Sequence, residues 1–252
     1  MLTRLLPLVA SEHGPAVDRL IGSVHWLIAV LAVGFLIFFV LCLVRFNRRA
    51  HPIATYRSVP ARLAWVVVGA IAIVELIELF VIAIPLWAAR VHGVPSPGEA
   101  TMIQVVAEQF AWNVHYPGPD GVFGRTDVRL VTPEDPIGLD RRDPAARDDY
   151  TTVNELNFPV GRPVVIQLTS KDVVHSLSLP QMRVKQDAIP GMMVTVWFVP
   201  TRTTEGAPWE INCSQLCGLA HYRMRGLYRS MPQHEFDEWA RTQLAALTPG
   251  SR

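Results

Sequence analysis

The sequence has little net charge and few cysteines. Asp, Glu, Lys and Arg make up 18% of its 252 residues, and the formal net charge is +1. Without an excess of basic residues, no nucleic-acid binding is expected. Three cysteines are too few for a small protein held together by disulfides, and the sequence has no internal repeats or low-complexity tracts. Apolar side chains are abundant instead, with 50% hydrophobic residues and a mean hydropathy of +0.24.

Charged side chains are missing altogether from residues 20–44, which Arg19 and Arg45 bound. A helix over this stretch, at about 1.5 Å per residue, is long enough to cross a hydrocarbon core of about 30 Å. A second apolar run covers residues 63–89. The sequence therefore predicts a hairpin of two transmembrane helices over residues 20–92, embedded in membrane lipid. A cleaved signal peptide is the alternative for the first span, but the run is too long for the hydrophobic region of such a peptide.

Basic residues are concentrated between the two spans. The N-terminal tail, residues 1–19, has Arg4 and Arg19, whereas the connecting loop, residues 45–62, has Arg45, Arg48, Arg49, Arg57 and Arg62. Because positively charged loops remain in the cytoplasm, this loop is predicted to be cytoplasmic. The chain is then a multi-pass membrane protein with both termini outside, in the periplasm or its equivalent.

Two carboxylates interrupt the second apolar run. Glu75 and Glu78 are three residues apart, so they share one face of a helix, and Glu75 falls near the middle of the bilayer. An ionised carboxylate in lipid costs at least a few kcal/mol, so these side chains are expected to face protein or water. They form either a polar seam against a partner helix or part of a proton pathway, and both alternatives require a partner subunit.

The character of the sequence changes after the second span. Residues 93–100 are a linker rich in Pro and Gly, and short β-like runs follow at residues 101–107, 163–169, 194–199 and 226–231. Residues 101–232 are therefore predicted to form a small β sandwich or barrel, with residues 117–150 as a long polar excursion between strands. An amphipathic helix is expected over residues 233–247 within the C-terminal segment 233–252, with Ser230 as a candidate cap.

Four candidate metal ligands lie within twelve residues. Cys213, Cys217, His221 and Met224 follow one another closely, and His175 lies on a strand-like segment upstream. Thiolate, thioether and imidazole are the ligands that select copper, and five of them are too many for one blue-copper ion. They suit two copper ions that share both sulfurs, which permits electron transfer because the pair spreads one electron over both metals. A disulfide leaves the His and Met without a role, and zinc takes methionine poorly as a ligand.

Three segments carry a resemblance to a known family. The stretches 172–176 (Asp-Val-Val-His-Ser), 187–191 (Asp-Ala-Ile-Pro-Gly) and 213–224 closely resemble subunit II of haem–copper cytochrome c oxidases. The aromatic segment 109–112 (Gln-Phe-Ala-Trp) is similar to one that the family carries early in its β domain. The order of parts, two membrane helices and then a periplasmic domain, is also that of the family. The resemblance implies a cupredoxin-like Greek-key barrel that holds a binuclear copper centre, CuA.

The resemblance also implies a ligand set and a role. The metal ligands carried over are the backbone carbonyl of Gln215 and the side chains of His175, Cys213, Cys217, His221 and Met224. Reduced cytochrome c, or another c-type cytochrome, delivers electrons to CuA, which passes them to haem in subunit I. Reduction of oxygen to water and proton translocation occur in subunit I, and subunit III is a further expected partner.

The sequence departs from the family pattern at several positions. Gln215 replaces a Glu whose side chain also binds magnesium, so a magnesium site is not carried over. Phe110 replaces a Trp at the surface where electrons arrive, which leaves Phe110 and Trp112 as the candidate aromatic side chains for that step. Arg62 stands in place of the Glu through which protons enter, so Glu75 or Glu78 is the candidate substitute. These departures indicate a divergent bacterial branch.

Two other functions remain open from the sequence. The CuA-bearing subunit of a nitric oxide reductase has the same copper ligands, and the difference lies in its catalytic partner. A membrane-tethered copper-binding or chaperone module also binds copper, but it requires exchangeable ligands. Ligands drawn from two distant segments, around residue 175 and residues 213–224, favour permanent burial of the metal.

Overall fold

The computed structural model describes residues 6–53 and 60–247, and residues 1–5, 54–59 and 248–252 lie outside the described part. Parts of the expected N-terminal tail, basic loop and C-terminal tail therefore fall outside the described residues. The chain divides into two compact units, a helical one over residues 16–89 and a β unit that combines residues 6–15 with the chain from residue 90 onward.

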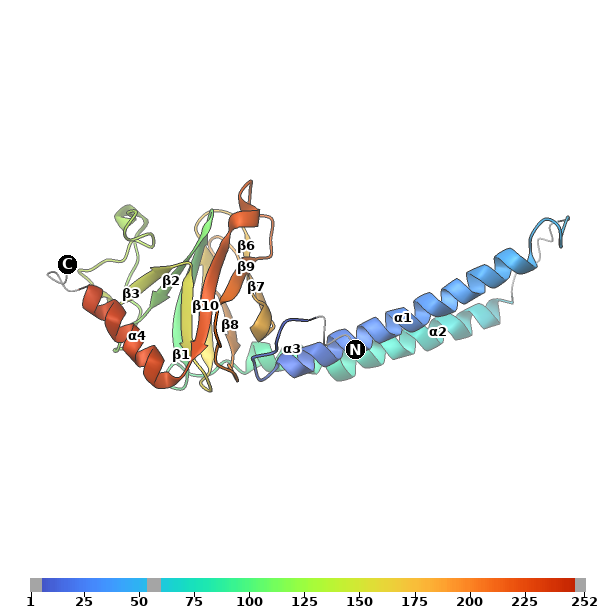
Figure 1. The fold of residues 1–252 in the computed structure, drawn as a ribbon, viewed down its shortest axis with the longest axis horizontal. Helices are drawn as coiled ribbons and strands as arrows, with labels where there is room; N and C mark the ends of the chain where they lie inside the picture. Colours follow the sequence, from blue (N-terminus) through green and yellow to red (C-terminus); the bar gives the residue numbers. More distant parts are fainter. Residues whose placement is uncertain (1–5, 54–59, 248–252) are drawn as a thin grey trace. The chain divides into compact units, whose positions relative to one another are not determined.

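The helical unit consists of two long apolar helices (Figure 1). The first is α1, Gly14–Arg45. The second runs from Ala61 to His92 and comprises α2 (Ala61–Ile77), a π-helical turn η2 (Glu78–Ala83) and α3 (Ile84–His92). Both helices have 32 residues and are apolar enough to cross a membrane, with outward side chains such as Phe35 and Val66 exposed in the isolated chain. The two predicted spans are thus confirmed as helices.

The β unit contains two five-stranded sheets. One has the order β3-β2-β1-β5-β8, built from Tyr150–Val153 (β3), Ala111–Tyr116 (β2), Thr101–Glu108 (β1), Val164–Ser170 (β5) and Val194–Phe198 (β8). The other has the order β4-β10-β9-β6-β7, built from Glu155–Pro159 (β4), Arg225–Met231 (β10), Trp209–Cys213 (β9), His175–Leu179 (β6) and Val184–Ala188 (β7). Neighbouring strands are antiparallel except for the parallel pairs β1–β5 and β4–β10.

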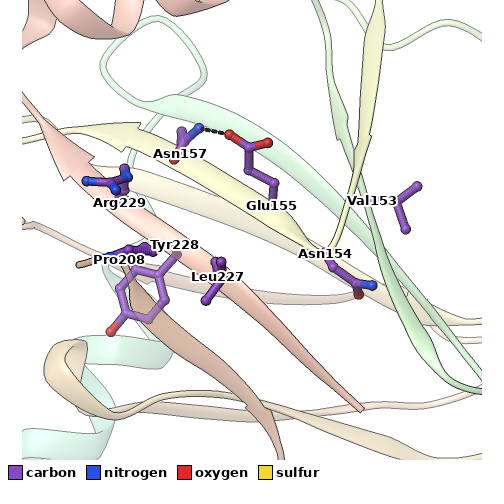
Figure 2. A pocket seen from close by; sticks show the side chains of 8 residues that line it. All are labelled: Val153, Asn154, Glu155, Asn157, Pro208, Leu227, Tyr228 and Arg229. Carbon is purple, nitrogen blue, oxygen red and sulfur yellow. Dashed lines mark hydrogen bonds between the residues drawn. The ribbon is translucent and has the colours of Figure 1, made fainter. Parts of the chain in front are cut away.

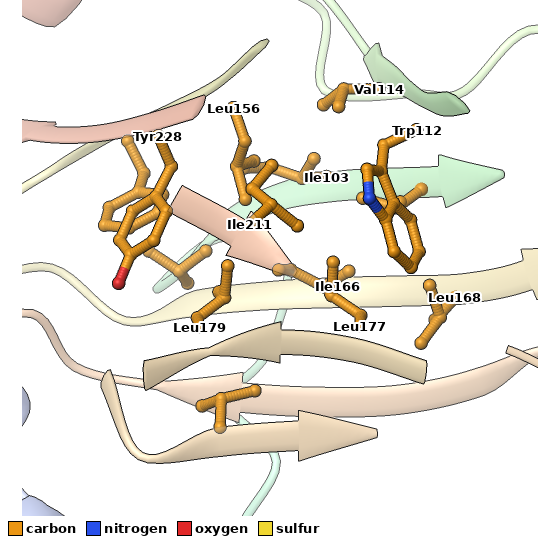
Figure 3. Packing of buried hydrophobic residues seen from close by; sticks show 14 of the residues in the cluster. Ile103, Trp112, Val114, Leu156, Ile166, Leu168, Leu177, Leu179, Ile211 and Tyr228 are labelled. Carbon is orange, nitrogen blue, oxygen red and sulfur yellow. The ribbon is translucent and has the colours of Figure 1, made fainter. Parts of the chain in front are cut away.

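The core lies between the two sheets. In β1, Ile103, Val105 and Ala107 are buried while the residues between them are partly exposed, which is the alternation of a strand with one face on a core. Large side chains from both sheets meet them, including Trp112, Ile166, Leu168, Leu177, Leu179, Ile211 and Tyr228 (Figure 3). The expected all-β domain is confirmed, and it takes the form of a two-sheet sandwich.

The terminal helix α4, Gln233–Ala246, closes one side of this core (Figure 1). Its Trp239 packs edge-on against the ring of Tyr116 at a centroid distance of 5.2 Å. The expected helix is confirmed, but the expected cap is wrong. Pro232 precedes the helix without a side-chain cap, and Ser230 is a buried residue of β10 instead. Ser230 already lay inside the β-like run predicted over residues 226–231, and in the structure it belongs to that strand and not to the start of the helix.

The excursion between β2 and β3 has its own small core. It contains two 3₁₀ turns, Val128–Leu130 (η3) and Pro144–Arg147 (η4). Ile137, Leu139 and Ala146 are buried together, and Val106 of β1 packs against them. A backbone bridge between Thr126 and Leu139 links its two arms. The excursion is therefore a folded lobe attached to the first sheet.

Candidate metal centre

The candidate ligands meet at the ends of β6 and β9. His175 is the first residue of β6 and Cys213 is the last residue of β9. These strands pair antiparallel, with Leu177 opposite Cys213, so both ligands lie at one end of the sheet. The segment from residue 214 to 224 joins β9 to β10 and carries the remaining ligands, with one 3₁₀ turn at His221–Arg223. The ligand loop, as we call residues 213–224, is thus a loop between strands.

The two thiols of the ligand loop are close but not bonded. Cys213 Sγ and Cys217 Sγ are 3.8 Å apart, and both cysteines are free. A disulfide requires a sulfur–sulfur distance of about 2.05 Å. Both sulfurs therefore remain available as metal ligands.

Further donors surround this pair of sulfurs. His175 Nδ1 lies 3.9 Å from Cys213 Sγ and 3.1 Å from Met224 Sδ. His221 Nδ1 lies 3.5 Å from Cys217 Sγ. The backbone oxygen of Gln215 lies 3.2 Å from Cys213 Sγ. One imidazole thus accompanies each sulfur, and the ligand atoms of His175, Cys213 and Cys217 all lie within 4.8 Å of one another.

The inner side of the centre is buried and the outer side is not. His175 is completely buried, Met224 and Cys217 are nearly so, and Cys213 and His221 are partly exposed. Burial, together with the neighbouring Cys213, raises the pKa of the Cys217 thiol from its usual 9.0 to about 11. The metal-free site therefore holds a neutral thiol at Cys217 near pH 7, and a metal must displace its proton on binding.

Asp172 fixes the orientation of His175. Its Oδ1 accepts a hydrogen bond from His175 Nε2 at 2.9 Å, which leaves Nδ1 directed at the sulfurs. Its Oδ2 accepts one from the backbone N–H of Gln109 at 2.7 Å. Partial burial works against ionisation, but the hydrogen bonds from His175, Gln109 and Val173 prevail and lower the pKa of Asp172. No role was predicted for Asp172 from the sequence. Its place three residues before His175 is the signal that could have indicated one.

Gln109 and Gly218 lock the ligand loop against the first sheet. Gln109 Nε2 donates to the backbone oxygen of Cys217 at 2.6 Å. Gly218 has φ = +133°, and a Cβ at this position would lie 2.7 Å from Gln109 Nε2 and 3.2 Å from Phe110. Glycine is needed here both for its backbone conformation and for the close approach. This contact between Gln109 and the ligand loop was not apparent in the sequence, because it joins residues more than a hundred positions apart.

The two candidate aromatic residues occupy different positions. Trp112 is completely buried and meets the ring of His175 edge-on, with centroids 6.2 Å apart. Phe110 is partly exposed and packs against the core and the ligand loop at Gly218. Trp112 therefore forms part of the wall behind His175, and Phe110 lies at the rim of the centre.

The two carboxylates expected in a polar seam or a proton pathway belong to the helical unit. Glu75 lies on α2 and is exposed in the isolated chain, whereas Glu78 begins the π-helical turn. Glu78 also lines a pocket between the two helices, together with Ser23 and Trp26 of α1. π-Helical turns are frequent at functional sites, and this one starts at a carboxylate.

A separate pocket lies over the edge of the second sheet and offers no comparable chemistry (Figure 2). It is lined by residues of β4 and β10 and of their connections, among them Asn154, Asn157 and Leu227. Glu155 accepts a hydrogen bond at 2.8 Å from Asn157, two residues further along β4. None of the residues that line it is a cysteine, histidine or methionine. The ligand loop therefore remains the candidate site for metal chemistry.

The donor set of this site fits copper. Two thiolates, two imidazoles and a thioether are soft or borderline ligands. Zinc sites use Cys, His and carboxylates, so they give no reason for Met224 Sδ to face His175 Nδ1 at 3.1 Å. The pairing of one imidazole with each sulfur also matches a centre for two metal ions more closely than a single tetrahedral site.

This chain is similar to known proteins over most of its length. A family model described as cytochrome c oxidase subunit II, periplasmic domain, matches residues 101–230, which include every candidate ligand. The alternative cytochrome c oxidase subunit 2 of Bradyrhizobium diazoefficiens is 31% identical over 229 residues, which is 90% of this chain and 80% of that protein. Cytochrome c oxidase subunit 2 of Cereibacter sphaeroides is 26% identical over 247 residues, which is 89% of this chain and 77% of that protein. The crystal structure of the periplasmic domain of subunit II of cytochrome oxidase of Bradyrhizobium japonicum is 28% identical, covers 62% of this chain and 99% of its own, and has a TM-score of 0.44.

Proposed function

Because the chain belongs to the cytochrome c oxidase subunit II family, we propose that it is the electron-accepting subunit of a respiratory haem–copper oxidase. The proposal assigns it a binuclear CuA centre held by Cys213, Cys217, His175, His221, Met224 and the backbone carbonyl of Gln215. The observation that carries it is the pair of free thiols 3.8 Å apart with one imidazole beside each. Oxygen chemistry belongs to subunit I and not to this chain.

The residues of the centre have distinct tasks under this proposal. When bound, a copper pair supplies one-electron redox chemistry, since copper alternates between two oxidation states. Cys213 and Cys217 would hold the two metals through their thiolates, and His175 and His221 would hold them through their imidazoles. Asp172 holds the tautomer of His175 with its proton on Nε2, and Trp112 excludes water from the buried side. The cupredoxin-like fold keeps these groups in place, so little rearrangement accompanies a change in charge.

The partners follow from the family and from the exposed surface. The ligand loop carries exposed apolar side chains at Leu216, Leu219 and Tyr222, and exposed apolar patches mark sites of protein interaction. We assign this surface to contact within the respiratory complex. Cytochrome c, or another c-type cytochrome, donates the electron, and haem in subunit I receives it. Subunit III completes the expected assembly.

The membrane arrangement is part of the same proposal. The helical hairpin spans the inner membrane, with the loop 45–62 in the cytoplasm and the β domain and both termini in the periplasm. Residues 1–19 form the N-terminal tail, 20–92 the hairpin, 93–100 the linker, 101–232 the copper domain and 233–252 the C-terminal helix and tail. Glu75 and Glu78 face a partner subunit and serve proton uptake, which the π-helical turn at Glu78 supports.

Copper stoichiometry of the full chain in detergent tests the assignment. We expect a binuclear loading and an EPR signal in which one unpaired electron couples equally to two copper nuclei. Cys217→Ser is expected to abolish this signal, whereas Cys42→Ser, in α1, is a matched control that leaves it unchanged. A single copper with an intense blue colour would refute the binuclear centre. Rapid loss of copper to a chelator would favour a chaperone.

The assembled complex tests the terminal reaction. We expect purified complex with reduced cytochrome c to consume oxygen, and Cys217→Ser to stop this while the complex stays assembled. Turnover of nitric oxide without oxygen consumption would replace the proposed oxidase with a nitric oxide reductase. The copper assignment would survive that result.

A further inference from the structure

Three carboxylates meet where the excursion between β2 and β3 begins and ends. Asp120 lies in its first turn, and Asp148 and Asp149 directly precede β3. Each of these residues has one carboxylate oxygen in a set whose members all lie within 4.8 Å of one another. Asp120 is exposed, Asp148 is half-buried and Asp149 is completely buried.

Three other acidic residues of the excursion form ion pairs with arginine. Asp127 pairs with Arg129, and Asp140 pairs with Arg125 and Arg142 at 3.4 and 3.2 Å. Asp143 also accepts from Arg125, at 3.4 Å. Within the described residues, no lysine or arginine side chain forms an ion pair with the carboxylates of the three-residue cluster. Their mutual repulsion is therefore balanced by less positive charge than elsewhere in the excursion.

Asp149 also indicates that the cluster binds a ligand. Its Oδ2 lies 2.6 Å from His115 Nε2 and accepts a hydrogen bond from the backbone N–H of Gly124 at 2.8 Å. Its Oδ1 is buried and has no hydrogen-bond partner. A buried carboxylate oxygen without a partner loses its hydration and gains nothing in return. A cation bound at this oxygen would satisfy it.

The backbone around the cluster is arranged to present oxygens. The N–H of Asp120 donates to Asp148 Oδ2 at 3.1 Å, and the N–H of Val122 donates to Asp120 Oδ1 at 2.8 Å. Gly118, with φ = +63°, lies so close to Asp148 that a Cβ there would overlap its backbone carbonyl. Asp120 and Asp148 are thus each held through one carboxylate oxygen by a backbone N–H.

We propose that Asp120, Asp148 and Asp149 form a Ca²⁺ site that joins the two ends of the excursion. Calcium binds carboxylate oxygens at about 2.3–2.6 Å in flexible geometry, so ligands on opposite sides of the ion are about 4.6–5.2 Å apart. The spacing in the cluster lies inside this limit. Magnesium requires a tighter octahedron, and copper prefers the soft ligands of the other centre. The site is therefore separate in chemistry from the copper ligands.

Calorimetric titration of the copper-loaded full chain with CaCl₂, after treatment with EGTA, tests this site. We expect one Ca²⁺ per chain, bound in the micromolar to millimolar range of calcium-binding modules, and MgCl₂ to bind at least about tenfold more weakly. Asp120→Asn and Asp148→Asn should each weaken Ca²⁺ binding by about tenfold or more, because each removes a charged ligand. Asp127→Asn, in the same excursion but paired with Arg129, is the matched control and should bind Ca²⁺ like the unaltered chain.

Two results would overturn the proposal. One is the absence of Ca²⁺ binding at millimolar concentration, and the other is binding that Asp120→Asn leaves unchanged. Asp120 is exposed, so its substitution does not endanger folding. Proteolysis within residues 120–147 supplies a second measurement. Ca²⁺ should slow it in the unaltered chain and in Asp127→Asn, and an equal slowing in Asp120→Asn would also count against the site.

Discussion

Replacing Asp172 with Asn is expected to alter the proposed copper centre without removing a ligand. The substitution keeps the size of the side chain and removes its charge. Asp172 accepts hydrogen bonds from His175 Nε2 at 2.9 Å and from the backbone N–H of Gln109 at 2.7 Å. An asparagine has a single acceptor oxygen, so it can keep the bond to His175 only by directing its NH₂ group at the N–H of Gln109. The histidine remains in place, but its hydrogen bond becomes neutral.

The size of the effect follows from the bond that changes. A hydrogen bond to a charged group contributes about 1.5–3 kcal/mol and a neutral one about 0.5–1.5 kcal/mol, so the loss is about 1 kcal/mol. About 1.4 kcal/mol corresponds to a factor of ten in affinity. The repulsion between the two donors adds to this loss. We therefore predict that Asp172→Asn weakens copper binding by about tenfold, at the lower end of the effects seen for residues that orient metal ligands.

Competition with a copper chelator at fixed pH measures this change. Asp237→Asn makes the same chemical substitution on the exposed face of α4 and is expected to leave copper affinity unchanged. Unchanged affinity in Asp172→Asn would refute the orienting role. Complete loss of copper from a chain with intact circular dichroism would also refute it, because a residue that only orients His175 cannot abolish the site.

Three further predictions concern Gly218 in the ligand loop, the Cys217 thiol and Ile166 in the core. Gly218→Ala should destabilise the ligand loop and weaken copper binding, because strained backbone costs about 1–3 kcal/mol and the added Cβ meets Gln109. Gly161, with φ = +78°, has open space around it. Gly161→Ala should therefore lower thermal stability but leave copper affinity unchanged. The thermal stability of the copper-free chain should fall as pH rises from 9.0 to about 11. In this range the Cys217 thiol keeps its proton in the folded state and loses it in the unfolded state. The fall in stability should be smaller in Cys217→Ser. Ile166→Ala should lower the free energy of unfolding by about 2–5 kcal/mol in denaturant titrations, since Ile166 is completely buried.

Strong local patterns in the sequence predicted their elements well. The β-like run at residues 101–107 corresponds to β1, and the run at 194–199 corresponds to β8. The short spacing from Cys213 to Met224 predicted one group of candidate ligands, and these side chains do converge with His175. In each case the signal lies within a dozen residues. Alternation in a strand and ligand spacing in a loop are local properties, so the sequence displays them directly.

Contacts between distant segments could not be predicted in the same way. The hydrogen bond from Gln109 to Asp172 joins β1 and β5 at the point where these parallel strands end, and it depends on their register. The bond from Gln109 to Cys217 adds the second sheet. Ser230 shows the converse error, because it resembled a helix cap locally and is buried in β10 by pairing with β4. Register across sheets is set by the whole core, and no short pattern records it.

The sheet holds the proposed copper ligands together through its own hydrogen bonds. The ends of the ligand loop are joined by the β9–β10 ladder, and the N–H of Cys213 donates to the carbonyl of Met224 at 3.4 Å. The N–H of Ser214 donates to Ser176 of β6 at 2.9 Å, which ties the loop to the strand that carries His175. Because the sheet already closes the loop, metal binding does not have to supply that conformational entropy. A site held in this way favours tight retention of its metal and little movement when the charge changes, which suits an electron carrier better than a chaperone that must release copper.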